Sequence, residues 1–344
     1  MSNRPETSTG TDPGRNSTAI EPKSRLIQKS DGSDSNMLAD RPAASTTPSA
    51  SSSGYRPFSI ARIGAICSNT LTELTRLKVF YFLLLFGLIL IAGSVFLARF
   101  SFQQEFQILK DVSLGAMSIF TSVLAIVATA RLIPQDIEDR TIYSILAKPV
   151  PRFEYLLGRL AGALLLLGVA ILAMSAVFLI VLYAREQIVV GETARQMANA
   201  PAEQTNQALQ AVRASALNPD LLPAIAIIYI KACLLAALTL FISTFATTNI
   251  FTVLVMVFVY FIGHLQGTAR EYWLHEHGAD WITRVFLAIV ALLFPDLQAF
   301  NLVDDAALGH AIPAIFFWKI AALGIFYIAV YTAMAAALFS AREL

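Results

Sequence analysis

Few residues of this chain have the types and spacing that catalysis or metal binding requires. The triplet His275-Glu276-His277 comes nearest to a metal site. Its histidines are two positions apart and would point to opposite sides of a helix, whereas zinc hydrolases place theirs four apart on one face. Cys67 and Cys233 stand far apart and match no metal-ligand or disulfide pattern. We therefore expect no metal centre and no cofactor here, and we expect both cysteines to act as small apolar residues.

One charge lies inside a long apolar run. Lys231 is flanked on both sides by uncharged residues. A charge within a membrane span is costly and often functional, so one interpretation places Lys231 on a translocation path. The alternative is that its ammonium snorkels toward an interface or pairs within the helix bundle. Lys319, near one end of the last apolar run, has the same two interpretations.

Charged side chains are densest in 131–159, between two apolar runs. Pro134 should end or kink the preceding helix, because proline has no amide hydrogen to donate. Carboxylates then suit the positive end of a short helix, which must stop before Pro149. This helix would carry Asp136, Ile137, Glu138, Asp139, Tyr143, Ile145 and Leu146. It would form a rigid projection; the alternative is a solvated loop whose charges only set the topology.

The composition is that of a membrane protein. Of the 344 residues 56% are apolar and 14% are charged, whereas soluble domains have roughly a quarter charged. The apolar residues are also gathered into long uncharged runs, which a water-soluble core does not need. The net charge of +1 provides no basic field for binding nucleic acid.

Six apolar runs are long enough to cross a bilayer, which takes roughly 20 residues per helix. The run 221–268 is too long for one helix and divides at the polar triplet Thr247-Thr248-Asn249. His264 and His310 flank spans, and we expect both at the membrane interface. The predicted fold is therefore an all-α polytopic bundle with spans at about 79–98, 112–133, 156–184, 221–246, 250–268 and 313–340.

Two regions flank this pattern. Residues 1–55 have few large apolar side chains, which predicts a disordered tail before a transmembrane domain at 56–344. Within 58–77, one helical face carries Ile60, Ile63, Cys67, Leu71 and Leu74, while Arg62, Asn69, Thr72, Glu73 and Arg76 fall elsewhere. We expect an interfacial helix there; the alternative is a cytoplasmic helix packed on the rest of the protein.

Two segments between spans are less regular. The run 285–295 is too short to cross the bilayer, so we expect a re-entrant helical element over 280–296 at the outer mouth. The alternative is an amphipathic helix lying on the surface. The segment 186–220 is rich in Ala, Gln and Glu, which favours helices outside the membrane.

Lysine and arginine near the span ends indicate the orientation, because cytoplasmic flanks carry an excess of them. With the N-terminus inside, the cytoplasmic flanks hold Arg56, Arg62, Arg76, Lys78, Arg131, Arg140, Lys148, Arg152, Arg159 and Arg342. The other side holds fewer, spread over longer loops. Both termini are therefore expected in the cytoplasm.

Three stretches resemble ABC-2-type transporter permeases. The loop 134–152 and the residues after it resemble that family's cytoplasmic loop through its acidic cluster, Thr141-Ile142, Ile145-Leu146, Lys148-Pro149-Val150, Arg152 and Gly158-Arg159. Asn69-Thr70, Glu73, Arg76 and Lys78 resemble its entry helix. The last third is matched by 294–297, Phe300-Asn301, Gly309, Tyr327, Tyr331 and 339–344. Two residues depart from the family pattern: Gln135 stands where an acidic residue is more common, and Arg159 stands where lysine is more common.

The resemblance implies a permease subunit, an exporter, in a bacterial cytoplasmic (inner) membrane. It would pair with a second permease copy or paralogue and with a dimer of cytoplasmic ABC ATPase subunits. The implied ATPase-coupling residues are Asp136, Glu138, Thr141, Ile145, Leu146, Lys148, Pro149 and Arg152. The chain has no G-x-x-x-x-G-K-[ST] loop, so ATP would be bound by the partner.

Two other classes of function stay open on the sequence. A multispan membrane enzyme needs paired polar catalytic groups within its spans, and the spans here contain isolated Lys231 and little else that ionises. A membrane scaffold without transport activity needs no such groups. An ATPase that copurifies with the chain would separate the three classes.

Overall fold

The computed structural model describes residues 59–98, 105–139, 151–276, 281–282, 285, 294–309 and 312–341. All regular structure in these ranges is helical. Six of their helices are long and apolar enough to cross a membrane, which confirms the predicted all-α fold with six spans. These helices are α2 (Lys78–Ala98), α3 (Glu105–Ala130), α6 (Arg152–Gln196), α8 (Leu221–Ser243), α9 (Asn249–Glu276) and α12 (Ala314–Ala341).

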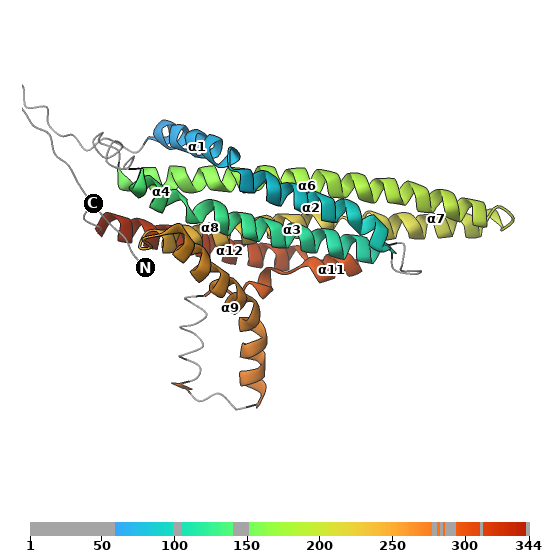
Figure 1. The fold of residues 1–344 in the computed structure, drawn as a ribbon. Helices are drawn as coiled ribbons and strands as arrows, with labels where there is room; N and C mark the ends of the chain where they lie inside the picture. The colour runs from blue at the N-terminus through green and yellow to red at the C-terminus, as the bar shows by residue number, and fades with distance from the viewer. Residues whose placement is uncertain are drawn as a thin grey trace, which may run out of the picture. The chain divides into compact units, whose positions relative to one another are not determined.

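Shorter helices lie near the two ends of this bundle. Helix α1 (Ile60–Thr75) and α4 (Leu132–Glu138) lie where α6 begins and α12 ends; we call this the α4 end (Figure 1). At the opposite end, α7 (Ala202–Ala216) packs against α6; we call this the α7 end. The 3-10 helix η1 (Gln298–Phe300) and α11 (Val303–Leu308) precede α12.

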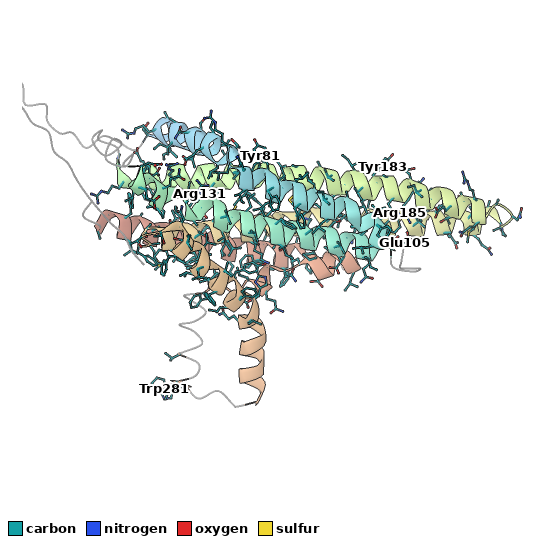
Figure 2. All side chains as sticks on the ribbon, viewed as in Figure 1. Tyr81, Glu105, Arg131, Tyr183, Arg185 and Trp281 are labelled. Carbon is teal, nitrogen blue, oxygen red and sulfur yellow. The ribbon has the colours of Figure 1, made fainter. Side chains whose placement is uncertain are left out.

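Three spans are longer than their apolar runs. Helix α9 continues to Glu276 rather than ending near 268. Helix α3 begins at Glu105 rather than near 112, and α6 continues to Gln196 rather than ending near 184. Polar contacts support the extensions of α3 and α6: Arg185 pairs with Glu105 at 2.7 Å (Figure 2), and Lys110 Nζ donates to the Ser215 carbonyl at 2.7 Å. An uncharged run marks only the apolar part of a helix, whereas the helix continues while its polar side chains find partners.

Helix α8 lies at the centre of the bundle. It contacts α3, α6, α9 and α12, and most of its apolar span is buried within the protein. It ends at Ser243, and α9 begins at Asn249, so the 221–268 run is divided beside the predicted polar triplet. A charged side chain on α8 must therefore find its partners within the bundle.

Helix α1 packs along the first turns of α6 through two glycines. A Cβ added to Gly158 would lie 2.7 Å from Ile66 Cβ, and one added to Gly162 would lie 2.6 Å from Thr70 Cβ. Only glycine lets the two backbones come this close. Arg62 and Glu73, which the apolar periodicity set apart from the apolar face of α1, make ion pairs with α6 while they remain partly exposed.

Some predicted features lie outside the described residues. These are the tail at 1–55, residues 140–150 of the coupling loop, most of the re-entrant segment at 280–296, and His310. From residue 294 the chain packs on α9, where the Leu297 amide donates to the Gly263 carbonyl at 3.0 Å. The α11 helix then ends at Gly309, whose φ of 74° lies in the left-handed region that glycine favours.

The glycine contact predicts opposite effects for matched substitutions on α6. Alanine in place of glycine adds about 1 kcal/mol of helix propensity at an interior position. At Gly168 the new Cβ would lie 3.6 Å from the Tyr229 hydroxyl, an ordinary contact, so Gly168→Ala should raise the unfolding temperature in detergent. Gly158→Ala and Gly162→Ala should lower it, because overpacking costs about 1–3 kcal/mol. Equal stabilisation by all three variants would contradict the close contact.

Candidate functional site

A cluster of buried charges joins three helices at the α4 end. Arg159 on α6 is 4% exposed, and its guanidinium forms ion pairs with Asp136 on α4 and with Glu73 on α1. The Arg159 Nη1 to Glu73 Oε2 distance is 2.5 Å. Thr70 Oγ1 also accepts from Nη1, at 3.4 Å. Because a buried charge without a partner is strongly destabilising, the three helices are held together through this one side chain.

Tyr155 completes the cluster from one turn earlier on α6. Its hydroxyl donates to Asp136 Oδ2 and accepts from Arg159 Nε at 3.3 Å. A second ion pair lies beside it, between Arg62 of α1 and the buried Glu154 of α6. Both guanidinium contacts are short, with Nε to Oε2 at 2.8 Å and Nη2 to Oε1 at 3.0 Å. This forked geometry is stronger and more directional than a single contact.

The end of α12 is attached to the same place. Arg152, at the start of α6, donates from Nη1 to the Ser340 carbonyl at 2.9 Å and to the Phe339 carbonyl at 3.3 Å. A cation near the last carbonyls of a helix is favourable, because those carbonyls lack helical partners. The Phe339 ring stacks on Tyr155 with a centroid distance of 6.0 Å. Four helices therefore meet within a few residues of Arg159.

The predicted coupling residues occupy different positions in this arrangement. Asp136 is 4% exposed and turned into the cluster, so its carboxylate is not on the surface. Arg152 holds the end of α12. Glu138 is exposed on the last turn of α4. The remaining predicted residues, Thr141, Ile145, Leu146, Lys148 and Pro149, lie outside the described residues.

Lys231 forms a second polar centre inside the bundle. It is 2% exposed, and its Nζ donates to Ser118 Oγ on α3 at 3.3 Å and lies 3.2 Å from His264 Nε2 on α9. Of the two interpretations of this lysine, pairing within the bundle matches these contacts. His264 contributes to this centre from the neighbouring helix.

The structure adds partners that sequence patterns did not identify. Arg159 was part of a motif, but nothing in its neighbourhood of the sequence pointed to Glu73, 86 positions away. The same holds for Arg62 with Glu154, 92 positions apart. The signal available in the sequence was that charged residues stand at the edges of apolar runs. At such positions a charged side chain must either reach water or pair with another charge.

No group of three or more His, Cys, Asp or Glu side chains in the described part of the chain is placed to hold a metal ion. His275 and Glu276 belong to α9, and His277 lies outside the described residues. Cys233 is buried, and burial raises the pKa of the Cys67 thiol, which disfavours a reactive thiolate.

Described residues from three stretches that resembled ABC-2 permeases thus come together: α1, α4 with the start of α6, and the end of α12. The family model described as ABC-2 family transporter protein matches residues 25–344. The chain belongs to the ABC-2 transporter family. A search of curated proteins found no match. This ABC-2 protein is a multi-pass membrane protein. It is a membrane component of a transporter, and its family works with an ABC ATPase subunit.

The ion cluster predicts a large stability loss when its cation is removed. Arg159→Met leaves Asp136 and Glu73 without their counter-charge and should cost about 3–5 kcal/mol in the free energy of unfolding. Arg195→Met is the matched control, since Arg195 is exposed near the end of the same helix, and it should change stability by about 0.5 kcal/mol or less.

Denaturant unfolding of the purified protein in detergent measures the stability changes of Arg159→Met and Arg195→Met. Adding Asp136→Asn to Arg159→Met should cost less than the two single changes together, because the second change removes a charge that the first left unpaired. Strict additivity would show that the two side chains do not interact.

Proposed function

We propose that this chain is the permease subunit of an ATP-driven exporter and that a separate ATPase dimer docks at the α4 end. Family membership supports the transporter class. The observation that carries the docking site is the attachment of α4 to α1 and α6 through Arg159, with α12 joined alongside through Arg152. A protein that pushes or pulls on α4 would move the ends of several helices at once.

The contacts divide the predicted coupling residues into two roles. Asp136 and Arg152 would transmit force inside the permease, since their side chains already bind α6 and the end of α12. Glu138 and Asp139, both exposed, would lie on the docking surface together with Thr141, Ile145, Leu146, Lys148 and Pro149. The chain contains no phosphate-binding loop of the G-x-x-x-x-G-K-[ST] type, so ATP would bind only to the partner and this subunit would use no cofactor.

The proposed orientation rests on the distribution of charge, and the proposed second permease copy rests on the number of spans. The α4 end carries the lysine and arginine excess, so it would face the cytoplasm of a bacterial inner membrane, with both termini on that side. Six spans form half of a permease pathway, so a second copy or a paralogue would complete it. The α7 end, where α6 and α7 form a polar hairpin, would lie on the outer side.

Reversing the exposed charges of α4 should weaken ATPase binding without unfolding the permease. We expect Glu138→Lys with Asp139→Lys to reduce copurification of the ATPase with the tagged permease several-fold and to abolish the stimulation of its ATP hydrolysis. The control is Glu192→Lys with Glu203→Lys, which reverses two exposed carboxylates at the α7 end. If the first variant binds and stimulates the ATPase as the control does, α4 is not the docking site.

Cysteine labelling in intact cells tests the orientation. In a background with Cys67→Ala and Cys233→Ala, a cysteine at Glu192 should react with a membrane-impermeant maleimide. A cysteine at Glu138 should react only after permeabilisation. The reverse pattern would place the α4 end outside and would remove the proposed docking site from the ATPase.

A further inference from the structure

An open cavity with several polar side chains lies between α3, α8, α9 and the start of α11. Its volume is about 310 Å³, and its polar lining consists of Asp111, Ser118, Lys231, Tyr260, His264 and Asn301. The α4-end cluster contributes nothing to it. The cavity therefore brings side chains from four parts of the chain to one place in an otherwise apolar bundle.

The ammonium of Lys231 has only neutral partners among the described residues. The His264 Nδ1 atom lies 2.9 Å from the Tyr260 carbonyl, which can only accept, so Nδ1 carries the proton. Nε2 of the neutral ring is then the acceptor for Lys231 Nζ, and the Ser118 hydroxyl is the other acceptor. The Tyr260 ring, 5.9 Å from Nζ, adds a cation–π contact.

This arrangement satisfies two of the three donors of the Lys231 ammonium and leaves its charge uncompensated. No salt bridge to Lys231 forms within the described part of the chain. An ammonium has three N–H donors, and the two acceptors found leave one donor for a further partner. Keeping a cation inside a bundle without a counter-ion is costly, and a methionine of similar length would avoid that cost.

Asp111 lines the cavity and Asp296 lies near it, but neither forms a salt bridge with Lys231 Nζ among the described residues. Asp111, an exposed residue, is seven positions before Ser118 on α3, which places it about 10 Å along the helix axis at 1.5 Å per residue. The Asp296 carboxylate accepts hydrogen bonds from the backbone amides of Gln298 and Ala299 in η1. The positive charge is therefore concentrated at the Lys231 side of the cavity.

We propose that this cavity binds an anionic group, a carboxylate or a phosphate, with Lys231 as its counter-ion. Ser118 and His264 position the ammonium, and Asn301 supplies a further amide at the wall. That this anion belongs to the transported molecule rests on the proposed transporter function. The binding itself does not, so it is measured on the purified full-length chain without ATPase.

The test compares four probes by their effect on the unfolding temperature in an uncharged detergent: hexyl phosphate, hexanoate, inorganic phosphate and hexyltrimethylammonium. The two anionic amphiphiles should raise the unfolding temperature in a saturable way, and the cationic one should not. Lys231→Met should weaken anion binding about tenfold or more, since a hydrogen bond to a charged group is lost. Lys110→Met, which changes another buried lysine outside this cavity, should bind as the unchanged protein does.

A second pair of variants keeps Lys231 in place. Gly115 lines the cavity, and a Cβ added there meets open space, so Gly115→Leu should fill the cavity and block anion binding. Gly93→Leu is the matched control, because Gly93 also has open space around it but lies on the exposed surface of α2. This pair decides the question even if Lys231→Met does not fold.

The outcomes separate as follows. Binding of inorganic phosphate that depends on Lys231 would indicate a small soluble anion, whereas binding of the amphiphiles alone would indicate a lipid-like molecule; both support the site. Equal effects of the cationic probe, or anion binding that survives Gly115→Leu, would overturn it. If no anion binds but the ATPase docks normally, the proposed site is wrong and the proposed function stands. If the anion binds but the ATPase does not dock at the α4 end, the site stands and the proposed docking function is wrong.

Discussion

The guanidinium of Arg159 imposes the main constraint on the α4 end of this protein. Burying a charge costs several kcal/mol, which is recovered only when partners surround it. Those partners come from α1 and α4 as well as from α6 itself, so each helix has a single acceptable height and rotation relative to the others. The ion pairs position α4 together with the burial of Leu132 and Ile133, because seven residues alone are too few for a stable isolated helix.

Close backbone packing makes this ion cluster geometrically accessible. Gly158 and Gly162 share a face of α6 with Tyr155 and Arg159, since residues three and four apart are neighbours on a helix. Without side chains at the two glycines, α1 approaches closely enough for its polar face to reach α6. The small residues and the buried charges therefore depend on each other: the glycines permit the approach, and the ion pairs make it favourable.

The two polar centres of the bundle differ in how their charge is balanced. At the α4 end, two carboxylates surround one guanidinium, and nearly every polar atom has a partner inside the protein. Such a closed cluster suits a mechanical joint. Around Lys231 the acceptors are neutral and a cavity adjoins the ammonium, so the charge balance is incomplete until something else enters. Such an incompletely balanced charge suits ligand binding, because an anionic ligand can form the ion pair with Lys231 that the bundle does not provide.

The sequence alone determined the class of this protein and most of its helices. Apolar runs of bilayer length can cross a membrane only as helices, because every backbone hydrogen bond must be made within the segment. The prolines and charges of 131–159 predicted a short helix between two spans, and the motif residues there carried the resemblance to ABC-2 permeases. The tertiary structure alone decided how these elements meet. It turned Arg62 and Glu73 toward α6, placed Asp136 inside and set His264 opposite Lys231. Periodicity reports the faces of one helix at a time, whereas an ion pair between residues far apart in the chain depends on the relative rotation and height of two helices.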